Sequence, residues 1–406
     1  MANTILTIDD ITSEALMILE NNLTFTKQVT RKYDDKFGNS GAQIGDTLRI
    51  RKPAQYSGRT GTALSPEDFT EDYTTLVLDK QFGVDVTFTT KELTLNINDF
   101  SDQVLAPAVA RIANEIDKDG LGQYKYVSQF VGVPETVPNA LLTYLQAKQK
   151  LMEAATPVDA NLAVVVNPAM EATIVNALSG LFHSTTEIKR QYEEGTMGRS
   201  AGFKWSMDQN VATHTVGALG GTPLTNGSNQ TGASLITDGW TAAAANRLKD
   251  GDIITIGDVF AVNPQSKQST GALKQFRVVG DTASDGSGNA TITIDPPIIA
   301  SGAKQNVTNA AADGKAILTF GHASSYASKN TPQALAFHKD AFCLGMADLL
   351  VPEGVHFAGR KSSRKLGVSI RIVRQYDINT DKIPCRLDVL YGWKTIRPEL
   401  ATRIVS

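Results

Sequence analysis

The feature that most constrains the fold is a change of pattern over residues 216–326. On both sides of this segment, apolar residues recur at helical spacing in some stretches and at every second position in others. Within it, short β-like runs are separated by clusters of Gly, Ser, Asn and Ala, with turn signals at Asp250-Gly251, Asp285-Gly286 and Asp313-Gly314. Five or more short strands without a helical pattern predict a small antiparallel β-barrel inserted into an α+β body.

The body around this insertion combines helices and strands. The period-two alternation over residues 76–88 predicts one long strand, with residues 48–51 as its partner, and further strands are expected from Val368 onward. The apolar run Leu162–Val166 predicts a buried strand. Apolar residues at helical spacing predict helices over residues 9–23, 101–130, 138–155 and 169–181.

Composition excludes several classes of protein. Of the 406 residues, 41% are hydrophobic and 20% charged, which is typical of a globular chain. The formal net charge of −3 gives no overall basis for tight binding to DNA or to an anionic membrane. The N-terminus has no signal-peptide pattern, and no apolar run approaches the roughly 20 residues that span a bilayer. We expect a soluble chain made in the cytoplasm, without membrane contact.

The sequence offers no constellation for catalysis or cofactor binding. His183 and Glu187 are four residues apart, but two ligands do not make a metal site. Residues 281–289 lack an acid at the third position of a calcium loop, and Ile292 stands where the bidentate Glu would be, so a hairpin turn explains them better. Cys343 and Cys385 lack metal-ligand spacing and are expected to be buried core residues. We therefore predict no catalytic residue, no metal and no cofactor. An α/β hydrolase-like enzyme with a dispersed triad and a β-rich virion or surface binding protein remain alternatives.

The order of segments resembles the major capsid (coat) proteins of tailed phages, which have the HK97 fold, and within them the P22-type branch with an insertion domain. The resemblance covers nearly the whole chain. It is carried by "GDTLRIRKP" and the long excursion after it, "VDVTFTTKELTLNINDFSDQVLAPAVARIANEID", "NLAVVVNP", "RLKDGDIITIGDVFAVN" and the terminal "LYGWKTIRPELATRIV".

The resemblance implies a domain organisation. It comprises an N-terminal arm (1–44), an extended loop (45–88), a peripheral domain with a spine helix (89–130 and 354–406), an axial domain (131–215 and 327–353) and the inserted barrel (216–326). The implied function is structural, not enzymatic: the chain assembles as hexamers and pentamers into the icosahedral shell around the phage genome. The implied partners are a scaffolding protein, a portal and loosely contacted double-stranded DNA, with assembly in the host cytoplasm and a procapsid that matures on DNA packaging.

The extended loop has a marked separation of charge. A structureless tip this long is uncommon in a compact domain unless it binds something, and about fifteen extended residues would reach roughly 50 Å. Basic residues lie on its outgoing half and acidic residues on its return. We hypothesise that the acidic residues meet a basic segment of a neighbouring subunit. The candidate contact residues are Glu67, Asp68, Glu71 and Asp72 on the loop and Arg360, Lys361, Arg364 and Lys365 on the neighbour.

Overall fold

The computed structural model describes residues 8–31, 47–58, 61–64, 66, 71–89, 105–178, 197–242, 245–322, 325–363 and 367–406. Contacts between residues divide the chain into two compact units. Unit 1 contains residues 1–50, 73–120 and 342–396, and unit 2 contains residues 51–72, 121–341 and 397–406. Each unit is therefore assembled from segments that are far apart in the sequence.

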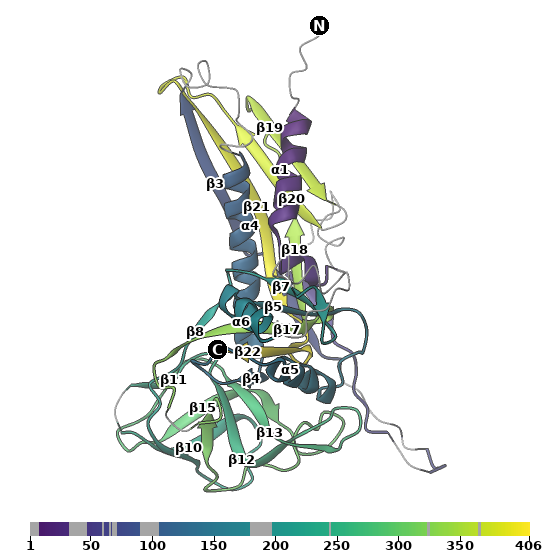
Figure 1. The fold of residues 1–406 in the computed structure, drawn as a ribbon, viewed down its shortest axis with the longest axis vertical. Coiled ribbons are helices and arrows are strands. Elements are labelled where there is room, and N and C mark those ends of the chain that lie inside the picture. The colour runs from purple at the N-terminus through teal and green to yellow at the C-terminus, as the bar shows by residue number, and fades with distance from the viewer. Residues whose placement is uncertain are drawn as a thin grey trace. The chain divides into compact units, whose positions relative to one another are not determined.

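Unit 1 is built on a five-stranded antiparallel sheet (Figure 1). The long strand β21 pairs with β3 along one edge and with β20 and β18 along the other, and β19 lies outside β20. Along β3 the apolar residues are half-buried and the residues between them are exposed, as expected when only one face of the sheet is covered. The strands are β3 (Lys80–Thr89), β18 (Phe342–Ala347), β19 (Phe357–Ser363), β20 (Val368–Arg374) and β21 (Lys382–Thr395).

Helices α1 (Ile8–Asn22) and α4 (Ala106–Leu121) pack against this sheet. Helix α1 contacts β19 and β20. Helix α4 is joined to β21 by a hydrogen bond: the indole Nε1 of Trp393, in β21, donates to the carbonyl oxygen of Ile116, in α4, at 3.1 Å. The predicted apolar stripe of α4 is fully buried, which confirms its helical spacing.

The predicted helix over residues 101–130 is shorter in the structure. Helix α4 ends at Leu121 and continues as the 3-10 helix η3 (Gly122–Tyr126), while residues 101–104 lie outside the described residues. Glycine lowers helix propensity, and Gly120 and Gly122 flank the point where the helix ends. A Cβ atom at Gly120 would approach two aromatic side chains within 2.7 Å, so packing also requires glycine there.

The predicted strand over residues 76–88 is two strands. The root of the extended loop is a two-stranded sheet of β1 (Thr47–Arg51) and β2 (Tyr73–Val77), which confirms the hairpin. The chain leaves this pairing after Val77, and β3 pairs with β21 instead. Alternation continues across the break because both strands have one covered face, so local pattern does not reveal the change of partner.

Unit 2 contains a mixed sheet in the order β4-β22-β17-β5-β7-β6, with β8 pairing to the start of β17. Strand β22 runs parallel to β4, and β5 runs parallel to β7. Every residue of β5 is buried, as the run Leu162–Val166 predicts. The strands are β4 (Phe130–Gly132), β5 (Leu162–Val166), β6 (Arg199–Ser200), β7 (Phe203–Met207), β8 (Thr213–Thr215), β17 (Asn330–His338) and β22 (Ala401–Val405).

Two of the predicted helices complete this part of unit 2. Helix α5 (Leu141–Glu153) and helix α6 (Pro168–Leu178) bury Tyr144, Leu151 and Ile174 in one cluster with the sheet. Both lie within the ranges predicted from the sequence, apart from the first residue of α6. Besides η3, the described residues form the 3-10 helices η1 (Thr26–Gln28) in unit 1 and η5 (Lys339–Ala341) and η6 (Pro398–Leu400) in unit 2.

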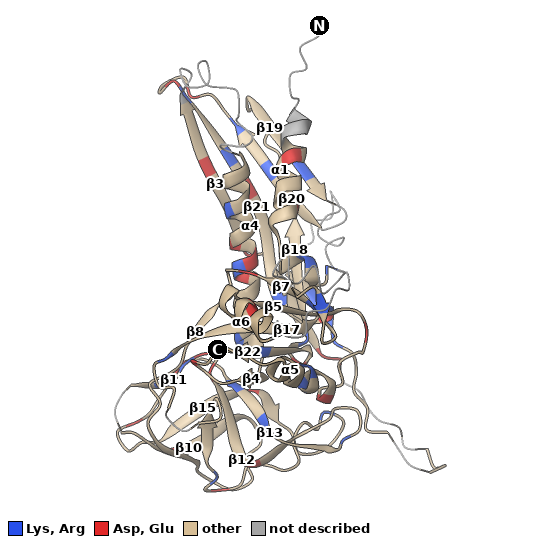
Figure 2. Cartoon of the chain, viewed as in Figure 1, with Lys and Arg blue, Asp and Glu red and all other residues tan. Residues whose placement is uncertain are grey.

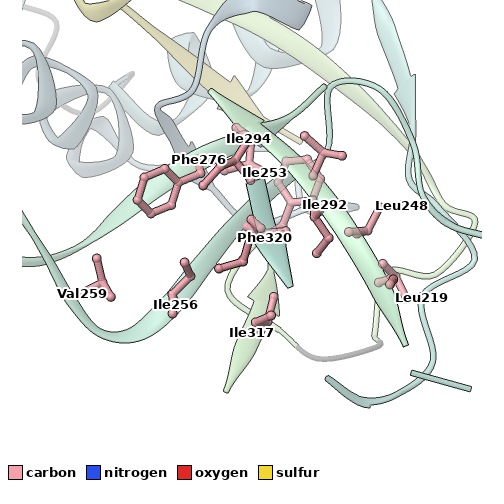
Figure 3. Packing of buried hydrophobic residues seen from close by; sticks show 14 of the residues in the cluster. Leu219, Leu248, Ile253, Ile256, Val259, Phe276, Ile292, Ile294, Ile317 and Phe320 are labelled. Carbon is pink, nitrogen blue, oxygen red and sulfur yellow. The ribbon is translucent and has the colours of Figure 1, made fainter. Parts of the chain in front are cut away.

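The predicted barrel is present as a nearly closed antiparallel sheet in the order β16-β12-β13-β15-β10-β9. A bridge between Leu224 and Ala316 joins the two edge strands. Its interior is filled by aliphatic and aromatic side chains, among them Phe276 and Ile292 (Figure 3). The strands are β9 (Gly221–Thr225), β10 (Gly232–Trp240), β12 (Ile253–Val262), β13 (Ser269–Val278), β15 (Ala290–Ile298) and β16 (Ile317–Thr319), with a small pair β11 (Asn246–Leu248) and β14 (Thr282–Ala283).

The boundaries of the two units depart from those of the predicted domains at several places, including residues 51–72 of the extended loop and residues 121–130 of the peripheral domain, which both group with unit 2. Residues 342–353, predicted as axial, group with unit 1 because β18 pairs with β21. Residues 397–406, predicted as peripheral, group with unit 2 because β22 pairs with β17 and β4. The differences at residues 342–353 and 397–406 arise from strand pairings between segments more than 40 residues apart, which sequence pattern does not reveal.

Candidate functional site

The root of the extended loop is anchored in unit 1. Strands β1 and β2 bury Ile50 and Leu76, which pack in one cluster with Cys343 and Ile396. The neighbouring residues Arg49 and Tyr73 stay on the outside, with the guanidinium carbon of Arg49 4.9 Å from the centre of the Tyr73 ring. A two-stranded ribbon is marginally stable alone, so these four buried side chains are what hold the hairpin in place.

Beyond this root, the loop over residues 51–72, called loop 51–72 below, is exposed wherever it is described. Every residue from 51 to 58 is exposed. Two large hydrophobic side chains lie on the loop: Tyr56 is 60% exposed and Leu64 is 83% exposed. Exposed apolar side chains on a projecting segment mark a surface that another molecule can cover.

The acidic half of this loop has partners within its own unit. Glu71 forms an exposed ion pair with Arg51 at 3.4 Å. Asp72 contacts Lys304, from the loop between β15 and β16, at 2.5 Å. Asp72 also accepts a hydrogen bond from the backbone of Lys52 through its carbonyl oxygen at 2.8 Å. Of the four predicted acidic contact residues, these two are therefore paired in cis, and Glu67 and Asp68 lie outside the described residues.

The predicted basic segment is likewise partly engaged. Arg360, in β19, donates to the carbonyl oxygen of Leu349 at 3.2 Å and lies 3.7 Å from a carboxylate oxygen of Asp348. Lys361 follows it in β19 and is also in contact within the chain. Arg364 and Lys365 lie outside the described residues. In the same unit, α4 and β3 also carry basic and acidic residues, coloured blue and red on the ribbon in Figure 2.

Two buried carboxylates, one in each unit, hold neighbouring segments together through hydrogen bonds. The sequence pattern did not identify either of them. In unit 1, Asp117 on α4 accepts hydrogen bonds from the backbone of Thr24 and Thr26, at 2.6 and 3.0 Å, and fastens the segment after α1. In unit 2, Asp252 is fully buried and pairs with His214 at 2.8 Å. The signal for Asp117 was an acid directly after an apolar helical stripe, whereas Asp252 sits in an ordinary-looking turn.

Neither arrangement has the features of a catalytic centre. His214 and Asp252 are almost completely enclosed, so no substrate reaches them. Within the described ranges, no group of three His, Cys, Asp or Glu side chains is placed to hold a metal ion. His183 and Glu187 lie outside those ranges. No described helix is long and apolar enough to cross a membrane.

Comparison with known protein families identifies the family of this chain. A family model described as "P22 coat protein - gene protein 5" matches residues 1–403. The chain belongs to this family. It is a major capsid protein of the tailed-phage type, with an α+β phage capsid fold and a structural, not enzymatic, role. Many copies of such a coat protein assemble into the shell of the virion. The enzyme and surface-binding alternatives are thereby set aside.

Solved structures similar to the coat protein are distant in sequence. The match from Mycobacterium phage Che8 has 13% identity and a TM-score of 0.44, covering 94% of this chain and 90% of the other. The capsid of Ralstonia phage GP4 has 8% identity and a TM-score of 0.47, covering 94% and 88%. The bacteriophage PhiM1 mature capsid has 10% identity and a TM-score of 0.43, covering 94% and 86%. No curated protein matches the chain.

Proposed function

We propose that the coat protein builds its shell by placing loop 51–72 on a neighbouring subunit. The observation that carries this proposal is the contrast along the hairpin: its root is buried by Ile50 and Leu76, while Tyr56 and Leu64 farther out are exposed. An anchored root fixes the direction of the loop, and the exposed side chains gain from being covered by another copy. Many modest contacts of this kind sum to a stable shell through multivalency.

In this proposal the two units correspond to the domains of the capsid fold. Unit 1, with α4 as the spine helix, serves as the peripheral domain. The mixed sheet of unit 2, with α5 and α6, serves as the axial domain, and the barrel is its insertion. Copies group as hexamers and pentamers, assemble first with a scaffolding protein and a portal, and mature when double-stranded DNA enters. The net charge of −3 suits an inner wall that contacts DNA loosely.

The residues of the charge hypothesis do not all contribute equally to a contact between subunits. Glu71, Asp72 and Arg360 already have partners in their own units. Lys361 is also in contact within the chain. We therefore place the contact to be tested at Glu67 and Asp68 on the loop and at Arg364 and Lys365 on the neighbour, the four candidates that lie outside the described residues. Isolated surface ion pairs contribute only about 0 to 1 kcal/mol, so the contact steers assembly and adds little stability per copy.

A charge-swap experiment tests this contact. The double variant Glu67→Lys, Asp68→Lys should fold normally, as judged by circular dichroism, but assemble more slowly in light scattering. The variant Arg364→Glu, Lys365→Glu should show the same defect. Combining all four substitutions should restore assembly because opposite charges face each other again. Normal assembly kinetics in both double variants, or no rescue in the combined variant, would reject the contact.

A further inference from the structure

The inserted barrel and the mixed sheet of unit 2 meet at a buried polar network. It connects four segments: η3, strand β8, the turn before β12 and the last strand β22. Its members, Tyr124, His214, Asp252 and Arg403, are all at most 4% exposed. Buried polar groups of this kind persist only when each is paired, so the network is a specific structure and not an incidental contact.

Arg403 is the end of this network on the side of the mixed sheet. Its guanidinium donates to three backbone carbonyls: Val127 at 2.8 Å, Gly251 at 2.7 Å and Lys125 at 3.3 Å. Its central carbon lies 5.2 Å from the centre of the Tyr124 ring. Gly251 belongs to the barrel turn before β12, whereas Val127 and Lys125 belong to the segment before β4. One side chain on β22 therefore holds the barrel and the sheet at the same time.

Asp252 is the other end, on the barrel side. One carboxylate oxygen pairs with Nε2 of His214 at 2.8 Å, and the other accepts backbone hydrogen bonds from Gly217 at 3.1 Å and Lys249 at 2.8 Å. Nε2 of His214 donates to this carboxylate, and Nδ1 is hydrogen-bonded to the Tyr124 hydroxyl at 3.2 Å. The chain Asp252–His214–Tyr124 thus runs from the barrel to the face of the Arg403 guanidinium.

The network lies where the chain enters and leaves the barrel. Strand β8, which carries His214, immediately precedes the barrel, and residues 326–330 lead out of it. These two crossing segments are held together by hydrogen bonds from Val216 N to Lys329 O and from Ser328 N to Gly217 O, both at 2.9 Å. A second polar contact also joins the barrel to the mixed sheet. The side-chain amide of Gln275, in β13, accepts a hydrogen bond from the backbone nitrogen of Phe130, in β4, and donates one to its carbonyl oxygen.

We propose that Asp252, His214, Tyr124 and Arg403 form a latch that seats the barrel on the mixed sheet, separately from the interactions that fold the barrel. The barrel interior is closed by its own strands and its own apolar cluster, to which the sheet contributes Phe130 and Val405. Breaking the latch therefore frees the barrel from the sheet and exposes the crossing segments, while the barrel itself stays folded.

Limited proteolysis of the full-length chain tests the latch. In Arg403→Met and in Asp252→Asn, thermolysin should cut the crossing segments, residues 211–218 and 326–330, at least tenfold faster than in the unmodified chain. A resistant fragment of about residues 216–326 should persist. The matched control is Asp258→Asn, which removes an exposed carboxylate paired with Lys315 on the barrel surface and should leave the cutting rate unchanged.

Two results would overturn the proposal. Unchanged cutting at the crossing segments in both variants would show that the network does not seat the barrel. Loss of the resistant fragment at the same rate as the crossing segments are cut would show that the network holds the barrel interior instead. Should Arg403→Met and Asp252→Asn yield no soluble chain, Tyr124→Phe decides, because it keeps the ring beside Arg403 and removes only the hydroxyl. A severalfold rise in cutting at the crossing segments is expected there, and an unchanged rate would count against the latch.

Discussion

The barrel and the extended loop are both long insertions, and they differ in how their side chains are buried. Residues 216–326 contain 15 charged residues among 111, and their strands close on one another around a shared apolar interior. Residues 45–80 contain 11 charged residues among 36, and the described part beyond the root is exposed. The barrel is completed within the chain, whereas the side chains of loop 51–72 are exposed wherever the structure describes them.

The largest expected effect separates the two regions by stability. Phe276 is fully buried in the barrel, so Phe276→Ala should lower the free energy of unfolding by about 3 to 5 kcal/mol. Tyr56→Ala removes an aromatic ring of similar size from the loop, where it is 60% exposed, and should change stability by less than about 0.5 kcal/mol. Urea unfolding of the free subunit measures both. Equal losses in the two variants would remove the distinction.

A smaller effect concerns the pH dependence of the barrel. Lys274 is half-buried in β13, and burial lowers the pKa of its ammonium from 10.5 to about 8. Below about pH 8 both folded and unfolded chains carry the proton, so the cost of holding this charge is fully present. Between about pH 8 and 10.5 the folded state releases the proton first, and the free energy of unfolding rises with pH.

Replacing this lysine should flatten that rise. Lys274→Met should stabilise the subunit at pH 7 by about 1 to 3 kcal/mol, with the gain shrinking as the pH approaches 10. Urea unfolding at several pH values gives the difference between the two proteins, which isolates Lys274 from other groups. A constant difference across this pH range would mean that Lys274 is not held in a desolvated site.

The smallest expected effect concerns the ion pair at the base of loop 51–72. Asp72 and Lys304 are both about half exposed, so their coupling should be below about 1 kcal/mol. A double-mutant cycle of Asp72→Asn and Lys304→Met, followed by urea unfolding at low and high salt, measures this coupling. It should fall further with added salt. A coupling of several kcal/mol would instead make the barrel a structural support for the loop.

Features set by neighbours in the sequence were predicted well. The apolar stripe of α4, the buried strand Leu162–Val166 and the turns of the barrel follow from local spacing and turn chemistry. The division between β2 and β3 was not predicted, because it depends on pairing with β21, some 300 residues later. Sequence pattern also does not reveal that Glu71 and Asp72 of the loop form ion pairs within their own chain.

The buried network was beyond the reach of sequence reasoning for a different reason. Arg403 occupies a strand whose residues are all buried, where a cation is unexpected, and its acceptors are backbone carbonyls that carry no sequence signature. Tyr124 and His214 are 90 residues apart, and His214 and Asp252 are 38 apart. Only the three-dimensional arrangement brings these groups together. The family resemblance, in contrast, rests on the order of segments and needed no such contacts.

Hydrogen exchange of the free subunit and of assembled shells tests the central claim most directly. Amides of the barrel strands β12 and β13 should be strongly protected in both states. Amides of residues 54–58 should exchange rapidly in the free subunit and become at least tenfold slower in the shell, because a neighbouring copy covers them. Equal protection of residues 54–58 in the two states, or their rapid exchange in the assembled shell, would contradict the account.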